Sequence, residues 1–144
     1  MRTLIVEDDF TSRLILQEVL KDYGTVHVAV NGTEAVDAMR QAMATGEHYD
    51  IICMDIIMPE MDGQTALKQI RDMERKAGIG GNDRVKIVMT TALADPDNVT
   101  KAIREHCDGY LVKPFNKASI LEHLRKFGLI KLACSTVSSD IILG

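Results

Sequence analysis

The 144-residue sequence has few cysteines, no excess of positive charge and no long hydrophobic run. Its three cysteines lack zinc-ligand spacing, which favours reduced thiols over a disulfide framework. With 17 basic and 21 acidic residues, it has no general positive field to attract nucleic acid or an anionic membrane. No segment approaches the roughly 20 apolar residues that span a bilayer, and acids interrupt the N-terminus too early for a signal peptide. We therefore expect a cytoplasmic protein that binds neither nucleic acid nor membrane.

The sequence does contain a regular alternation of short apolar runs and longer segments of helical periodicity. The apolar runs predict five strands, at residues 2–6, 25–30, 50–55, 85–90 and 109–112. The helical segments cover residues 11–22, 33–45, 63–77, 96–106 and 116–127. Strands that are apolar throughout are typical of a parallel sheet covered on both faces. Right-handed crossovers then give a three-layer α/β sandwich.

Polar side chains follow four of these strands at their carboxyl ends. They are Glu7, Asp8 and Asp9 after the first strand, Asp55 at the third, Thr90, Thr91 and Ala92 at the fourth, and Lys113 after the fifth. In open α/β sheets, binding sites form beyond the carboxyl ends of the strands. We therefore expect acids, a hydroxyl and an ammonium group to converge at one edge of the sheet.

The charges at this edge predict a metal ion. Lys113 alone cannot neutralise three crowded carboxylates at the mouth of a low-dielectric sheet, so a divalent cation is expected. All the available ligands are oxygen atoms, which favours Mg²⁺ with one or two carboxylates and several waters. A Mg²⁺ site beside a carboxylate, a lysine and a hydroxyl predicts phosphoryl transfer, with Asp55 as the nucleophile that becomes an aspartyl phosphate.

Four motifs, VEDD, DIIMPEMDG, TTA and YLVKPF, occur in this order at the ends of those strands. Together they resemble the receiver domain of two-component response regulators, of the stand-alone, chemotaxis-regulator type, over residues 1–127. The resemblance implies a flavodoxin-like sheet in the order 2-1-3-4-5 with five helices. It also implies a phosphoprotein switch in phosphorelay signal transduction rather than an enzyme. A histidine kinase or phosphotransfer protein would supply the phosphoryl group, and a partner protein would be controlled through residues 96–127.

The resemblance assigns the metal ligands residue by residue. Asp55 matches the phosphorylated aspartate, Asp8 matches the metal-binding acid, and Glu7 matches the acid that acts on the metal through water. The backbone carbonyl of Ile57 completes the implied set. Asp9 lies one residue beyond the acidic pair, so we expect it to be a helix-entry charge.

The resemblance also assigns the groups that bind the phosphoryl group. Thr91, next to Ala92, matches the switch hydroxyl, because 113 − 91 = 22 positions separate it from Lys113, the spacing typical of the family. Lys113 matches the phosphoryl-binding lysine, and a cis peptide bond to Pro114 is implied. Tyr110 matches the aromatic side chain that turns inward when the switch threonine engages phosphate. We expect Thr90 to serve in strand packing.

Two apolar side chains predict a long-lived phosphate. Ile57 lies two residues after Asp55, and Leu93 lies two residues after Thr91. Hydrolysis needs a water held in line with the phosphoryl group, and a polar side chain beside the site must orient that water. Neither Ile57 nor Leu93 can do so, and we therefore expect slow self-dephosphorylation.

Two other functions were weighed against the same residues. A phosphatase like the haloacid dehalogenases places a second acid two residues after its nucleophile, where this sequence has Ile57. A flavin-binding module of flavodoxin type needs a phosphate-binding loop after the first strand, where the acids of EDDF would repel phosphate.

The C-terminal segment, residues 128–144, is too short to fold alone. We therefore expect a receiver without an attached output domain. The segment is also too apolar for a disordered polar tail. It is expected to pack on the domain or on a second copy, which would make a homodimer.

Overall fold

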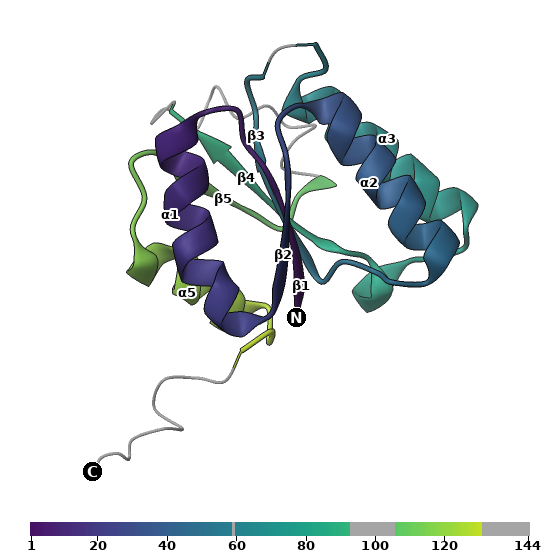
Figure 1. Ribbon diagram of the computed structural model, residues 1–144. Helices are drawn as coiled ribbons and strands as arrows, with labels where there is room; N and C mark the ends of the chain where they lie inside the picture. Colours follow the sequence, from purple (N-terminus) through teal and green to yellow (C-terminus); the bar gives the residue numbers. More distant parts are fainter. Residues whose placement is uncertain (59, 93–105, 131–144) are drawn as a thin grey trace, which may run out of the picture.

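The computed structural model describes residues 1–58, 60–92 and 106–130 and shows a parallel sheet between two layers of helices (Figure 1). The strands are β1 (Arg2–Val6), β2 (Thr25–Ala29), β3 (Ile51–Asp55), β4 (Lys86–Thr91) and β5 (Gly109–Val112). Their order in the sheet is β2-β1-β3-β4-β5. The predicted fold class is confirmed, and every strand agrees with its predicted range to within one residue at either end.

Four α-helices lie in the described part of the chain. They are α1 (Phe10–Leu20), α2 (Gly32–Thr45), α3 (Gly63–Lys76) and α5 (Lys117–Lys126), with short 3-10 helices η1 (Lys21–Tyr23) and η2 (Gly81–Asp83). Figure 1 shows α1 and α5 on one face of the sheet and α2 and α3 on the other. The predicted helix 96–106 lies outside the described residues except for its last one.

Side-chain caps fix where each α-helix begins. The capping residues are Asp9 for α1, Asn31 for α2, Asp62 for α3 and Asn116 for α5. Each side chain accepts a hydrogen bond from a backbone N–H three residues on, at 2.8–2.9 Å. Such a cap typically stabilises a helix by about 1 kcal/mol. The prediction that Asp9 is a helix-entry residue is confirmed.

The strands carry a core on each face of the sheet. Side chains of β1 and β3 alternate between the two cores: Leu4 and Ile52 pack toward α2 and α3, whereas Ile5 and Cys53 pack toward α1 and α5. All five residues of β3 are buried. The first four residues of β3 are apolar, and its last residue, Asp55, lies at the carboxyl edge of the sheet.

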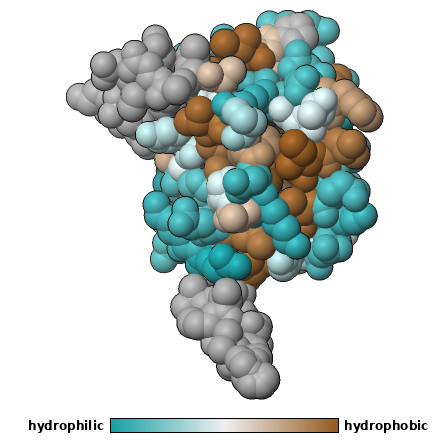
Figure 2. Space-filling model, turned by 90° about the vertical axis from the view of Figure 1, so that its left-hand side faces the viewer, coloured by the Kyte–Doolittle hydropathy of each residue, from teal (hydrophilic) through white to brown (hydrophobic). Residues whose placement is uncertain are grey.

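None of the helices in the described residues is both long and apolar enough to cross a bilayer. Figure 2 looks onto the side that carries α1 and α5 and shows hydrophobic side chains grouped among hydrophilic ones. Leu129 and Ile130 pack against the core on this side. The rest of the C-terminal segment, 131–144, lies outside the described residues, so its packing stays a prediction.

Candidate functional site

Three carboxylates meet at the carboxyl edge of the sheet. Glu7 follows β1 and is fully buried, Asp55 ends β3 and is 6% exposed, and Asp8 is exposed at the rim. One oxygen from each lies within 4.8 Å of the other two. This set of hard oxygen ligands fits Mg²⁺, which accepts a few carboxylates and keeps several waters. The predicted convergence of the acids is confirmed.

Lys113 lies against two of these acids. Its Nζ is 3.0 Å from Glu7 Oε1 and 3.1 Å from Asp55 Oδ2. The backbone N–H of Lys113 donates to Thr91 O at 2.7 Å, which ties the end of β5 to the end of β4. The peptide bond between Lys113 and Pro114 is cis, as the resemblance implied. Lys113 is therefore one partner of Asp55, as predicted.

One ammonium group does not neutralise both buried carboxylates. The pKa of Glu7 is raised to about 7, first because burial disfavours its charged form and then because Asp55 is close, while Lys113 opposes the rise. Burial alone would lower the pKa of Lys113, but its hydrogen bonds and charge interactions with Glu7 and Asp55 raise it. Glu7 thus takes up a proton near neutral pH when no metal is bound, and a metal ion competes with this proton.

We expect the metal-free protein to lose stability as the pH rises through about 7. The pKa of Glu7 in the folded protein, about 7, exceeds its value of 4.5 in the unfolded chain. Its contribution to stability is therefore complete below the unfolded value and is lost as the pH rises through the folded value. Urea unfolding with a chelator should show a decrease on the order of 2 kcal/mol between about pH 5 and pH 8. Glu7→Gln should remove this dependence, and an unchanged dependence in that variant would contradict the assignment.

The hydroxyl groups of β4 complete the floor of the site. Thr91 is buried at the end of the strand, and Ala92 beyond it is exposed. Thr90 Oγ1 donates to Glu7 Oε1 at 3.4 Å, a contact that the sequence analysis missed because it treated Thr90 as strand packing. The sequence carries no signal for this contact, because it depends on the strand register, which places Thr90 opposite Asp55.

The turn after β3 holds the Asp55 carboxylate in place. The backbone N–H of Ile57 donates to Asp55 Oδ1 at 3.3 Å, while the Ile57 side chain is 66% exposed. Gly63, the first residue of α3, has no room for a side chain, because a Cβ there would lie 2.1 Å from the carbonyl oxygen of Asp55. A glycine is therefore required where α3 meets the end of β3.

The structure does not place two of the predicted residues among the contacts of the site. Tyr110 on β5 is 38% exposed and belongs to the surface in this structure. Leu93 lies outside the described residues. The roles predicted for these two residues, and that of the Ile57 carbonyl, stay predictions.

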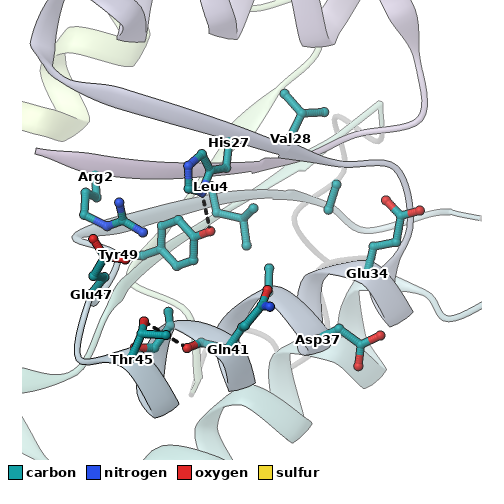
Figure 3. A pocket seen from close by; sticks show the side chains of 13 residues that line it. Arg2, Leu4, His27, Val28, Glu34, Asp37, Gln41, Thr45, Glu47 and Tyr49 are labelled. Atoms are coloured by element: carbon teal, nitrogen blue, oxygen red, sulfur yellow. Dashed lines mark hydrogen bonds between the residues drawn. The ribbon is translucent and has the colours of Figure 1, made fainter.

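A separate hollow of about 550 Å³ opens beside β2 and α2 (Figure 3). Tyr49 and His27 meet there, with His27 Nδ1 and the Tyr49 hydroxyl 2.7 Å apart. Its charged lining residues, which include Arg2, Glu34 and Asp37, are of both signs. None of the residues of the acidic site lines this hollow. The carboxylates, the lysine and the hydroxyls that can carry out chemistry converge instead at the carboxyl edge of the sheet.

Comparison with known proteins shows the family of the chain. The family model for the response regulator receiver domain matches residues 3–125. The chain belongs to the receiver domain family. It is 35% identical over 128 residues to the chemotaxis protein CheY of Bacillus subtilis, a match that covers 87% of this chain and 95% of that protein. Several other relatives are much longer histidine kinases, of which the chain spans between 4% and 12%.

Solved structures of other receivers share the fold. The receiver domain of Ssk1 from Saccharomyces cerevisiae, in complex with the phosphotransfer protein Ypd1, superimposes with a TM-score of 0.76 at 32% identity and covers 90% of this chain and 89% of that one. The CheX–CheY–BeF₃–Mg²⁺ complex from Borrelia burgdorferi gives a TM-score of 0.73 at 25% identity, with 91% and 90% covered.

As a receiver domain, the chain is a phosphoacceptor regulatory protein of two-component phosphorelays. It takes a phosphoryl group on an aspartate from a histidine kinase or phosphotransfer protein. The related complex from Borrelia burgdorferi contains Mg²⁺, and Glu7, Asp8 and Asp55 offer a set of oxygen ligands that fits this ion. Family membership also decides against the phosphatase and flavin-binding alternatives.

Proposed function

We propose that Asp55 is the residue that becomes phosphorylated. The observation that supports this most strongly is that both of its carboxylate oxygens are fixed, one by Lys113 Nζ and the other by the N–H of Ile57. Glu7 is fully buried, so its carboxylate is less accessible to a phosphoryl donor. Asp8 is exposed at the rim. Asp55 therefore combines an oriented carboxylate with a position at the carboxyl edge of the sheet, beside Lys113 and the other acids.

The groups around Asp55 provide the charge balance for the transfer. Asp8, Asp55 and the carbonyl of Ile57 would hold Mg²⁺ directly, with Glu7 acting through water. When bound, Mg²⁺ neutralises oxygens of the transferred phosphoryl group. The ammonium group of Lys113 binds a further phosphoryl oxygen. One oxygen of Asp55 attacks phosphorus in line with the leaving group, so that its bond to phosphorus forms as the donor's bond breaks.

The same site provides a switch that controls a partner. The Thr91 hydroxyl, supported by the backbone at Ala92, moves toward the phosphoryl oxygens and leaves space beside β5. Tyr110, which is 38% exposed in this structure, turns into that space. A charge change at Asp55 thereby repacks the face that carries β5 and α5, which would contact the target. The predicted helix 96–106, which we expect to share in this output, lies outside the described residues except for its last one.

The donor is a protein of the phosphorelay. Ypd1, a phosphotransfer protein, and CheX are partners of homologous receivers. We infer that a histidine kinase or phosphotransfer protein docks on this chain in the cytoplasm, a reducing compartment that suits the thiols of Cys53 and Cys107. We infer that the receiver unit is residues 1–127, followed by the apolar C-terminal segment 128–144, of which the structure describes only 128–130.

We expect the phosphorylated protein to decay over many minutes rather than seconds. The exposed Ile57 side chain cannot orient a hydrolytic water, and neither can Leu93. Combining Ile57→Asn with Leu93→Glu should accelerate decay by about tenfold or more, because polar groups then hold the water in line. The decay is followed by intact-protein mass spectrometry after the donor is removed. Ile57→Val is the control and should decay like the wild type. Rapid decay of the wild type, or no acceleration in the double variant, would contradict the prediction.

Incubation of the wild-type protein with acetyl phosphate tests the proposed function. With Mg²⁺ we expect the mass to rise by one phosphoryl group, and the adduct to be lost on mild base treatment, as an acyl phosphate should be. Replacing Mg²⁺ with a chelator should prevent the reaction, because the acidic site is then uncompensated. The absence of any adduct in the presence of Mg²⁺ would overturn the proposal.

A further inference from the structure

A second cation lies at the rim of the acidic site. Arg13, in the first turns of α1, donates from Nη1 to the backbone carbonyl of Glu7 at 3.1 Å. Its guanidinium carbon lies 5.5 Å from the ring centroid of Phe10, which is 65% exposed. The Phe10 ring and the Glu7 carbonyl therefore hold the guanidinium group beside Glu7, whose side chain lies in the acidic site.

Arg13 and Lys113 reach this edge of the sheet from different elements. Arg13 lies on α1 and contacts the backbone carbonyl of Glu7, whereas Lys113 follows β5 and contacts the Glu7 carboxylate. Arg13 is half-buried, so its charge is only partly screened by solvent.

An approaching donor adds negative charge to an edge that is already acidic. Four acids, Glu7, Asp8, Asp9 and Asp55, lie at this edge, and an incoming phosphoryl group carries about two negative charges at neutral pH. Lys113 is already engaged by Glu7 and Asp55. A guanidinium group has five N–H donors in a planar fork that matches phosphate oxygens, and the described contact with Glu7 uses one of them.

We propose that Arg13 is a donor-binding residue that holds the phosphoryl group of the incoming donor before transfer to Asp55. This inference rests on the proposed function of Asp55. With acetyl phosphate as donor, Arg13 binds an oxygen of the phosphoryl group. The bond between an Asp55 oxygen and phosphorus then forms, the phosphorus–oxygen bond to the acetyl group breaks, and acetate leaves with the electron pair.

A structural role for Arg13 predicts a different outcome. If Arg13 only braces the turn after β1 through Glu7, its loss should loosen the acids and weaken both Mg²⁺ binding and phosphorylation. If Arg13 binds the donor, its loss should slow phosphorylation but leave Mg²⁺ binding unchanged or tighter, because one positive charge near the metal is removed. The phosphorylation rate falls without a loss of Mg²⁺ affinity only if Arg13 binds the donor.

The test uses full-length Arg13→Gln and Arg13→Lys with Lys21→Gln as the matched control. Lys21 lies at the opposite end of α1, where it pairs with the exposed Glu18, and the control removes the same charge. Phosphorylation rates are measured by intact mass at low acetyl phosphate and saturating Mg²⁺. Affinity for Mg²⁺ is measured by titration without donor.

We expect Arg13→Gln to be phosphorylated about five- to tenfold more slowly, Arg13→Lys about two- to threefold more slowly, and the control like the wild type. The dissociation constant for Mg²⁺ in Arg13→Gln should stay the same or fall by up to about threefold. A rate in Arg13→Gln within twofold of the wild type, or a parallel loss of Mg²⁺ affinity, would overturn the inference. A wild-type protein that accepts no phosphate would instead overturn the proposed function.

Discussion

Asp55→Asn should accept no phosphoryl group from acetyl phosphate and Mg²⁺, whereas the wild type should be labelled to near completion. The amide removes the nucleophilic oxygen but keeps the size of the side chain. It can still accept a hydrogen bond from the N–H of Ile57, which donates to Asp55 Oδ1 at 3.3 Å. The loss of one charge also relieves the crowding that raises the pKa of Glu7, so the variant should fold at least as well. Intact-protein mass spectrometry measures the result.

Asp9→Asn is the matched control for this experiment. It makes the same chemical change at the same edge of the sheet, but Asp9 serves as the N-cap of α1. Asparagine caps helices about as well as aspartate, so α1 should be unaffected. We expect normal labelling of this variant. Labelling that persists in Asp55→Asn, or that disappears in Asp9→Asn, would contradict the assignment of the nucleophile.

Arg71→Met should destabilise the protein by about 3–5 kcal/mol, because it leaves buried charges without their partner. Arg71 on α3 is buried and pairs with the buried Glu74 at 2.7 Å and with Asp108, before β5, at 2.9 Å. Its guanidinium group also donates to the carbonyls of His106 and Val85, both at 2.8 Å. The group therefore joins α3, the start of β4 and the chain leading into β5. Urea unfolding measures the loss.

Arg75→Met is the control for Arg71, one helical turn along α3. Arg75 also pairs with a carboxylate, that of Asp72, but its side chain is 72% exposed. Such exposed pairs contribute about 0–1 kcal/mol, so this variant should be close to the wild type. Combining Arg71→Met with Glu74→Leu should recover part of the stability, because it removes one of the stranded charges. Equal losses of stability in the two arginine variants would show that the buried network around Arg71 contributes no more to stability than the exposed ion pair of Arg75.

The residues at the carboxyl edge of the sheet could be predicted because the sequence signals that mark the end of each strand are local. An apolar strand that ends in a polar residue places that residue at the carboxyl edge, and this rule located Glu7, Asp55, Thr91 and Lys113. The partners of Asp55 then followed from charge alone, since a lysine after β5 and acids after β1 meet at the same edge.

The contacts that the sequence analysis missed depend on tertiary structure. Arg71 and Glu74 continue the buried stripe of Leu67 and Ile70 at helical spacing, but a periodic pattern counts them as polar surface residues. The buried Arg71 also pairs with Asp108, which lies 37 residues after Arg71 in the chain, and a local pattern cannot reveal this partner. The contact of Thr90 with Glu7 likewise depends on strand register, which the apolar pattern of β4 does not define.

Locating the phosphate within the chain tests the central claim most directly. Borohydride reduces an aspartyl phosphate to homoserine and leaves unmodified carboxylates unchanged. The protein is therefore phosphorylated with acetyl phosphate and Mg²⁺, reduced, digested and analysed by peptide mass spectrometry. We predict homoserine at position 55 and at no other acid of the site. We expect no reduction at Asp8 or Asp9, where the product would also be homoserine, or at Glu7, where it would be the alcohol that is one methylene group longer. Reduction at any of these three positions, or no reduction at Asp55 in a protein that carries phosphate, would contradict the assignment of Asp55.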